Sequence, residues 1–297
     1  MTALAPDLAM DVLTPLSLAE ALDMKRNRPD ALVICGGTDV MVAMNFDRVR
    51  PPAIMDVSRL EELQEVRQDG DRIVLGAGVT YARIIRELPP FTPLAQASRT
   101  VGSPQIRNRG TVGGNLGTAS PAGDALPVLA AYDADVLVAS AERGERALAW
   151  REFLTGPKST ALEPDELIVA TRWRVTRGPG SFSKIGTRNA MVIAVASVCL
   201  VLDEASRTVR VALGSVGPTI LRAHDAERFA SALVPWDGPL GVMDAESSER
   251  FGALVAEAAA PIDDVRGTAA YRRHACSMLA RRSLSWALSD RNGRASS

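Results

Sequence analysis

Two glycine-rich segments carry the residues best suited to bind a ligand. The first is Cys35-Gly36-Gly37-Thr38-Asp39, and the second is Thr111-Val112-Gly113-Gly114-Asn115, which is followed by Asp124. Adjacent glycines let the backbone approach a ligand closely because no Cβ intervenes, and successive N–H groups in such turns can surround an anion. Each segment also brings a hydroxyl and a carboxylate. The pair therefore predicts one extended ligand with a diphosphate group, held from two sides.

Each segment also has a purely structural interpretation. Residues 36–39 stand between a predicted strand and a predicted helix, where the helix dipole favours phosphate, although Thr38 or Asp39 could simply cap that helix. The second segment could be a glycine-rich surface turn. Asp124 could cap the helix that follows it. Lys184 has apolar neighbours on a predicted strand, which is typical of a surface side chain whose stem packs on the protein.

Other patterns for nucleotide binding or catalysis are incomplete. Gly76-Ala77-Gly78 lacks the third glycine of the dinucleotide-binding fingerprint, because Tyr81 occupies that place. No Gly-Lys-Ser/Thr sequence follows the glycines, so the chain does not read as a nucleotide hydrolase. The two histidines, His224 and His274, and three scattered cysteines predict no metal site, no iron–sulfur cluster and no Ser-His-Asp triad. We expect no catalytic side chain, and any chemistry then belongs to an organic cofactor.

Composition limits the possible partners and location. The chain has 297 residues, of which 46% are hydrophobic and 23% charged, and its formal net charge is −1. The length suits two domains, and the near-neutral charge argues against nucleic-acid binding. No apolar run is long enough to cross a bilayer, and residues 1–11 lack the regions of a secretory signal. We therefore expect a cytoplasmic protein without a membrane span.

The elements that must position these segments change character along the chain. The first part alternates strands and helices, and a Gly/Pro cluster at 176–180 marks a candidate domain boundary. The second part begins with two β-rich runs joined by a turn, which predicts an antiparallel pair. Strands are expected at 31–35, 53–57, 72–75, 136–139, 166–175, 192–202 and 208–213, and helices from 17, at 39–45, 81–88, 125–132, 229–233, 251–260 and 268–289, with 102–124 as a loop. The last helix is expected to place Tyr271, Ala275, Met278 and Leu279 on one face, away from Arg272.

The order of the motifs resembles one protein family. Four stretches occur in sequence: 34–39, 76–81, 105–115 and 120–124. Together with Phe153–Leu162, Asp263–Gly267 and Tyr271–Arg273, they closely resemble the FAD-binding medium subunit of molybdenum hydroxylases, the family of xanthine and carbon monoxide dehydrogenases. The resemblance covers nearly the whole chain.

The resemblance implies an α+β fold in two domains. Residues 1–176 would form a PCMH-type FAD-binding domain of two subdomains. Residues 180–290 would form a C-terminal domain with a small antiparallel sheet and flanking helices, and 291–297 a polar tail. FAD would lie non-covalently between the subdomains, with its diphosphate on the two glycine-rich segments. The implied FAD-binding residues are Ile34, Cys35, Gly36, Gly37, Thr38, Asp39, Val101, Thr111, Val112, Gly113, Gly114, Asn115, Thr118, Asp124, Ile168 and Lys184.

The resemblance also implies a place in an electron path. A large partner subunit would hold molybdopterin, and a small partner would hold [2Fe–2S] clusters, because this chain lacks the cysteines for them. Electrons would pass to FAD in this chain and then to NAD+ or another acceptor, in a dimer of heterotrimers. Two alternatives remain: a self-contained flavin reductase of the PCMH fold, and a scaffold subunit that has lost its flavin.

Overall fold

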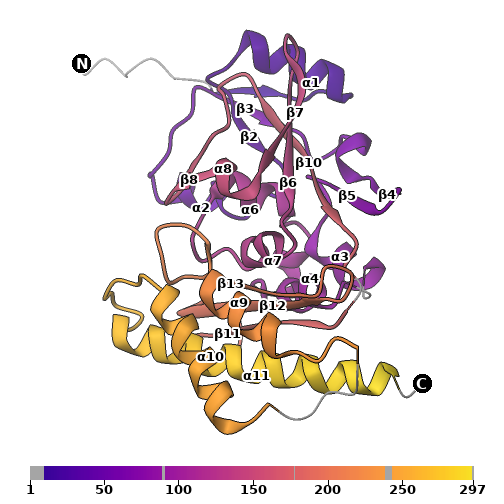
Figure 1. Ribbon diagram of the computed structural model, residues 1–297. Coiled ribbons are helices and arrows are strands. Elements are labelled where there is room, and N and C mark those ends of the chain that lie inside the picture. The colour runs from indigo at the N-terminus through magenta and orange to yellow at the C-terminus, as the bar shows by residue number, and fades with distance from the viewer. Residues whose placement is uncertain (1–9, 89–90, 177, 238–242, 296–297) are drawn as a thin grey trace.

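Three main sheets are arranged from the amino-terminal end of the molecule to its carboxy-terminal end. The computed structural model describes residues 10–88, 91–176, 178–237 and 243–295. Two of the sheets occupy the upper half of Figure 1, the third lies in the lower half, and a layer of short helices separates them. The expected α+β architecture is confirmed. Pro89, Pro90 and Arg177, at the expected helix end and domain boundary, lie outside the described residues.

The first sheet is parallel and small. Its strands are β1 (Asp11–Leu13), β2 (Leu32–Ile34) and β3 (Ala53–Asp56), in the order β1-β3-β2. Parallel neighbours need crossover connections, which here contain α1 (Leu18–Asn27) and α2 (Val40–Asn45). Ser17 caps α1 by accepting a hydrogen bond from the Glu20 amide. The sheet places the end of β2, and hence the first glycine-rich segment, at its carboxyl edge.

The second sheet is antiparallel and has one apolar core on each face. Its order is β4-β5-β10-β6-β7, with β8 and β9 as a separate small pair. Alternate residues point to opposite faces, so Val74 packs toward the first sheet and Leu75 toward the helical layer. The strands are β4 (Val66–Asp69), β5 (Arg72–Gly76), β6 (Asp135–Ser140), β7 (Gly144–Ala149), β8 (Leu154–Gly156), β9 (Ser159–Thr160) and β10 (Leu167–Arg174), with short helices η1 (Glu61–Gln64) and α8 (Trp150–Phe153).

The helical layer contains the second glycine-rich segment. Its members are α3 (Tyr81–Glu87), α4 (Thr92–Thr100), α5 (Pro104–Arg107), α6 (Val112–Thr118) and α7 (Ala125–Ala131). The expectation of a loop over 102–124 is therefore wrong, because α5 and α6 lie within it. Glycine disfavours helix, but burial of Val112 and Leu116 holds α6 in place.

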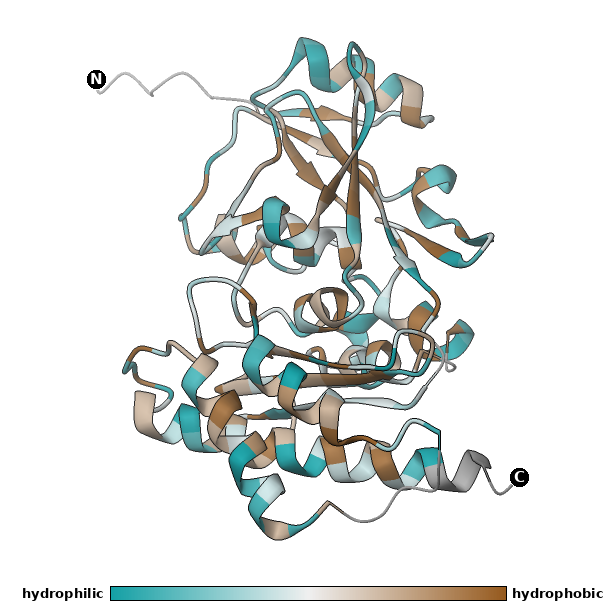
Figure 2. Ribbon diagram, viewed as in Figure 1, coloured by the Kyte–Doolittle hydropathy of each residue, from teal (hydrophilic) through white to brown (hydrophobic). Residues whose placement is uncertain are grey.

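The third sheet is packed on both faces. Its order is β11-β12-β13-β14, all antiparallel, and every residue of β12 is buried. Cys199 faces the helical layer, whereas Leu200 faces three carboxy-terminal helices. Figure 2 shows its brown strands between these two helical layers. The elements are β11 (Gly180–Ile185), β12 (Ala196–Asp203), β13 (Thr208–Gly214), β14 (Leu221–Arg222), α9 (His224–Leu233), α10 (Ala245–Ala258) and α11 (Ala269–Ala295).

The expected face of the last helix is partly wrong. Ala275 is buried as expected, but Tyr271 is 46% exposed and Arg272 is buried. The Arg272 guanidinium donates hydrogen bonds to the carbonyl groups of Val195 and Ser215 at 3.2 and 2.7 Å. A charged side chain is thus buried because backbone acceptors and a carboxylate partner surround it, which hydrophobic periodicity cannot reveal.

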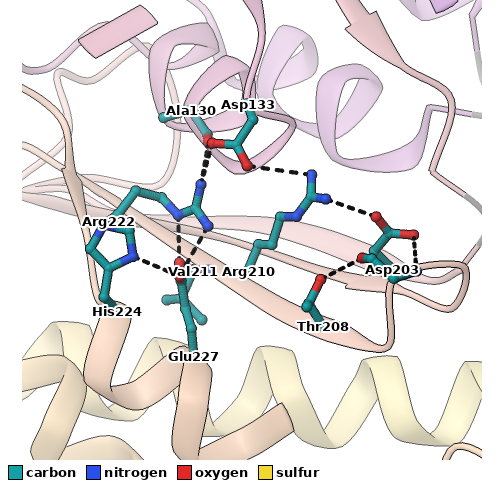
Figure 3. Close-up of polar contacts among 10 residues, drawn as sticks. Ala130, Asp133, Asp203, Thr208, Arg210, Val211, Arg222, His224 and Glu227 are labelled. Atoms are coloured by element: carbon teal, nitrogen blue, oxygen red, sulfur yellow. Dashed lines mark hydrogen bonds and ion pairs between the residues drawn. The ribbon is translucent and has the colours of Figure 1, made fainter. Parts of the chain in front are cut away.

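A polar network fixes the carboxyl end of α7 against the third sheet (Figure 3). Arg222 of β14 donates to the Ala130 carbonyl at 3.0 Å and to Asp133 at 2.7 Å, and it pairs with Glu227 at 2.5 Å. Arg210 of β13 lies 3.6 Å from the same Asp133. Because α7 is buried throughout and held at this end, it is a rigid link between the helical layer and the third sheet.

Candidate functional site

The first glycine-rich segment requires glycine at two positions, one for packing and one for its backbone conformation. A Cβ on Gly36 would lie 2.1 Å from the Arg109 carbonyl oxygen, so this glycine lets the first segment touch the residues just before the second. Gly37 has φ +74°, a left-handed conformation that favours glycine. The two segments, which are 70 residues and more apart in sequence, therefore lie in direct contact.

The backbone of the first segment has unused donors. The N–H groups of residues 36–39 make no hydrogen bond to any other part of the chain that the structure describes. Asp39 occupies the cap position of α2 but makes no capping hydrogen bond, and its carboxylate instead accepts one from Thr118 at 2.9 Å. Neither Thr38 nor Asp39 thus acts as a side-chain cap, and the free N–H groups are available to an anion.

The second segment begins a helix with two very different glycines. The Thr111 hydroxyl caps α6 by accepting from the Gly114 amide at 3.0 Å. A Cβ on Gly113 would lie 2.6 Å from the Ala77 carbonyl oxygen. Gly114, in contrast, is exposed, and only the Thr111 hydroxyl would lie near its Cβ, at 3.2 Å. Gly117, one turn later, is also exposed, so α6 presents bare backbone along one side.

Two buried oxygen atoms beside this helix lack partners. They are Oδ1 of Asn115 and Oδ1 of Asp124, and neither accepts a hydrogen bond from any residue in the described ranges. Native proteins rarely leave such atoms unsatisfied, so each calls for an explanation. A ligand with hydroxyl or N–H donors would satisfy them.

Lys184 crosses from the third sheet to the start of α7. Its ammonium lies 2.5 Å from Oδ2 of Asp124, and it also donates to the carbonyl groups of Thr100 and Val192 at 2.9 and 3.1 Å. The side chain is only 10% exposed, so its interpretation as a surface lysine is wrong. Burial raises the pKa of Asp124, and the lysine charge and the Thr100 hydroxyl oppose that rise. All three ammonium hydrogens already have acceptors within the chain.

The remaining expected residues lie around these contacts. Cys35 is half-buried, and burial raises the pKa of its thiol while a hydrogen bond with Thr111 lowers it. Val101 ends α4, and its carbonyl accepts from Arg107 at 3.1 Å. Ile168 of β10 packs beside Gly117. Ile34 ends β2, and Val112 is buried in the core beneath α6.

Several residues of the site were missed by sequence reasoning. Thr100 donates to Asp124 at 3.0 Å, and Ala77 lies against Gly113. Neither residue type carries a local signal, because each matters only through a contact distant in sequence. Gly117 had a signal, since it follows Gly114 at the three-residue spacing of one helical face.

The described residues hold no metal-binding cluster of histidine, cysteine or acidic side chains. His224 is exposed and contacts Glu227 at 3.0 Å, as part of the network at the far end of α7. Among the described helices, none combines the length and apolar character that crossing a membrane requires.

Comparison with known proteins identifies the family. Residues 8–172 match the FAD-binding domain of molybdopterin dehydrogenases, and residues 181–287 match the carbon monoxide dehydrogenase flavoprotein C-terminal domain. The chain belongs to the FAD-binding subunits of the molybdenum hydroxylase family. It is therefore a flavoprotein subunit of an oxidoreductase, and the resemblance and the cofactor expected from its sequence are confirmed.

Relatives of this FAD-binding subunit match over most of its length. It is 33% identical to the caffeine dehydrogenase subunit beta of a Pseudomonas species over 74% of this chain and 78% of that one. It is 30% identical to the nicotine 6-hydroxylase medium subunit of Paenarthrobacter nicotinovorans over 93% and 96%. Its structure matches carbon monoxide dehydrogenase from Oligotropha carboxidovorans with a TM-score of 0.84 at 26% identity, covering 95% of this chain and 98% of that one.

The geometry of this FAD-binding subunit fits its cofactor. The free N–H groups of residues 36–39 and the bare backbone at Gly114 suit a diphosphate. The unpartnered oxygens of Asn115 and Asp124 suit the hydroxyl and N–H donors of a flavin nucleotide. The two glycine-rich segments thus meet in one site.

Proposed function

We propose that this chain is the electron-transfer subunit of a multi-subunit molybdenum hydroxylase. In that role, electrons from [2Fe–2S] clusters of a small partner subunit reach NAD+ or another acceptor by way of this chain, after a large molybdopterin-binding partner oxidises the substrate. We further infer a dimer of heterotrimers in the cytoplasm. The observation that carries the proposal is the meeting of two glycine-rich segments, of which the first has free N–H donors at residues 36–39, in a family of FAD-binding subunits.

The chain's own residues would bind and orient rather than exchange protons. Residues 36–39 would hold the diphosphate through their backbone N–H groups, and the bare backbone of Gly114 would let it approach α6 closely. Asn115 and Asp124 would accept hydrogen bonds from the rest of the nucleotide. Lys184 would keep the Asp124 carboxylate in place. Bound FAD supplies the redox chemistry, which no side chain of the protein provides. All the residues named for this site in the sequence analysis, including Val101, Thr118 and Ile168, remain proposals as FAD contacts.

Purification from the native cell tests the assignment of partners. The tagged full-length chain should co-purify with one large molybdenum-containing chain and one small iron–sulfur chain, in equal amounts. The complex should be yellow, with an absorbance band near about 450 nm. Anaerobic NADH should bleach that band if NAD+ is the acceptor, and the band should persist if another oxidant serves.

The same preparation separates the alternatives. A lone yellow chain that reduces a substrate with NADH or NADPH would contradict the proposal and favour a self-contained flavin reductase. A colourless chain within the complex would favour a scaffold subunit without flavin.

A further inference from the structure

Arg109 has its backbone fixed at the contact between the two glycine-rich segments. Its carbonyl oxygen is the atom that a Cβ on Gly36 would strike, and its amide donates to the Ile106 carbonyl at 3.1 Å. The next carbonyl, of Gly110, accepts from the Tyr81 amide at 3.0 Å. Because the backbone is held from both sides, the start of the Arg109 side chain keeps a constant place relative to both segments.

The side chain of Arg109 has no polar partner among the described residues. It is exposed, and its guanidinium makes no hydrogen bond or ion pair with any residue in the described part of the chain. Its charge nevertheless reaches the Cys35 thiol, whose pKa it lowers against the larger effect of burial. Since the Arg109 carbonyl lies against Gly36, the side chain starts beside the first glycine-rich segment, within reach of a ligand bound there.

Two neighbouring cations, Arg107 and Lys184, already have partners. Arg107 donates to three carbonyl groups at the end of α4, at 3.0 to 3.3 Å, and Lys184 pairs with the Asp124 carboxylate. The anionic groups by the first segment include Asp39, held by Thr118, and Asp56, whose charge influences Cys35. A diphosphate on the free N–H groups would add further negative charge here, so the site needs a cation that is not already paired.

We propose that Arg109 is the phosphate-recognising residue of this site, with its guanidinium on the diphosphate oxygens of the flavin nucleotide. A guanidinium offers two parallel N–H donors to two phosphate oxygens, which an ammonium cannot do. Arg109 therefore makes the site select a flavin with a diphosphate over riboflavin, which has none. This inference rests on the proposed function, because it requires the site to hold FAD.

Flavin titrations of the full-length chain, stripped of bound flavin, test this role. We expect Arg109→Gln to weaken FAD binding about tenfold, because the loss of a hydrogen bond to a charged group lowers affinity by about that factor. Riboflavin binding should be unchanged. Arg109→Lys should recover part of the loss. Added NaCl should weaken FAD binding more steeply in the wild type than in Arg109→Gln. Arg282→Gln, at an exposed arginine on α11, is the matched control and should match the wild type.

The outcomes distinguish this role from the proposed function. Equal FAD affinity in Arg109→Gln and the wild type would overturn the role of Arg109 alone. An equal loss for FAD and riboflavin would also overturn it, because it would mean that the substitution distorts the loop. A wild-type chain that binds neither flavin would overturn the proposed function, and the role of Arg109 with it.

Discussion

The packed side and the open side of the proposed FAD site use glycine for different reasons. On the packed side, which comprises Gly36, Gly113, Asp124 and Lys184, a Cβ on either glycine would collide with a carbonyl group of the same chain. On the open side, which comprises Thr38, Asp39, Gly114 and Gly117, the two α6 glycines are exposed. The fold itself requires the first pair of glycines. It does not require glycine at positions 114 and 117, so we attribute these two glycines to ligand binding.

This comparison gives a general expectation. Changes on the packed side should lower the stability of the flavin-free chain, whereas changes on the open side should lower FAD affinity and leave that stability nearly unchanged. Stability of the flavin-free chain and FAD affinity, measured separately, therefore distinguish the two sides.

Lys184→Met should have the largest effect. It would leave the Asp124 carboxylate buried without its ion-pair partner, which typically costs about 3–5 kcal/mol. Urea denaturation of the flavin-free chain measures this loss, and Lys158→Met, at an exposed lysine, is the control. The double variant Lys184→Met/Asp124→Asn should recover much of the stability, because the uncompensated charge is then gone. A loss below about 1 kcal/mol in the single variant would show that the pair is as weak as a surface ion pair.

The same variant should respond to pH in a defined direction. Without the lysine, burial holds the pKa of Asp124 above the value of about 3.9 expected in the unfolded chain. The folded state then binds a proton more readily than the unfolded state, so stability should rise as pH falls through the raised pKa. In the wild type, Lys184 opposes the rise in pKa, and the increase on acidification should be smaller. Denaturation curves from pH 7 to pH 5 compare the two.

Gly36→Ala should have the next largest effect on stability. Its Cβ would meet backbone atoms of Arg109, which cannot turn aside as a flexible side chain can, so we expect a loss of about 2–3 kcal/mol. Gly117→Ala is the control, because its nearest contact would be an ordinary 3.7 Å and alanine favours helix. If both variants were equally stable, the close contact of the two segments would be refuted.

Gly114→Val should act on FAD rather than on the fold. Its side chain would occupy the bare backbone surface of α6, so we expect FAD affinity to fall about 10- to 100-fold, or about 1.4–2.7 kcal/mol. Flavin titration and denaturation of the flavin-free chain measure the two effects separately, and Gly114→Ala should give an intermediate loss of affinity. A large loss of stability with normal FAD affinity would show instead that Gly114 is needed for packing, like Gly36 and Gly113.

The sequence predicted the two glycine-rich segments as a binding site. It did not predict which glycines are needed for packing and which leave the backbone open to a ligand. Gly113 and Gly114 are adjacent and identical in type, and only the position of Ala77 separates their roles. Similarly, the apolar neighbours of Lys184 predicted a surface lysine, because Asp124 and Thr100 are 60 and 84 residues away in sequence. Contacts between segments so far apart cannot be derived from local pattern.

Local pattern succeeded where each element depends on its own residues. The β12–β13 hairpin follows from two apolar runs and a polar turn, and its register joins Asp203 with Thr208. The Ser17 cap likewise needs only residues within one helical turn. In contrast, α6 was expected to be a loop, because three glycines in seven residues outweighed the buried Val112 and Leu116, whose packing partners lie on other elements.

Thr118→Val should have the smallest effect, and it tests the link between the two segments. The substitution removes the hydrogen bond from the Thr118 hydroxyl to Asp39, in an exposed position, so stability should fall by no more than about 1 kcal/mol. The Asp39 carboxylate would then be free to move toward the bound diphosphate and repel it, and FAD affinity should fall about twofold, or about 0.4 kcal/mol. Thr118→Ser keeps the hydroxyl and should match the wild type in a flavin titration. Tighter FAD binding by the valine variant would mean that the hydrogen bond holds Asp39 near the phosphates instead of away from them.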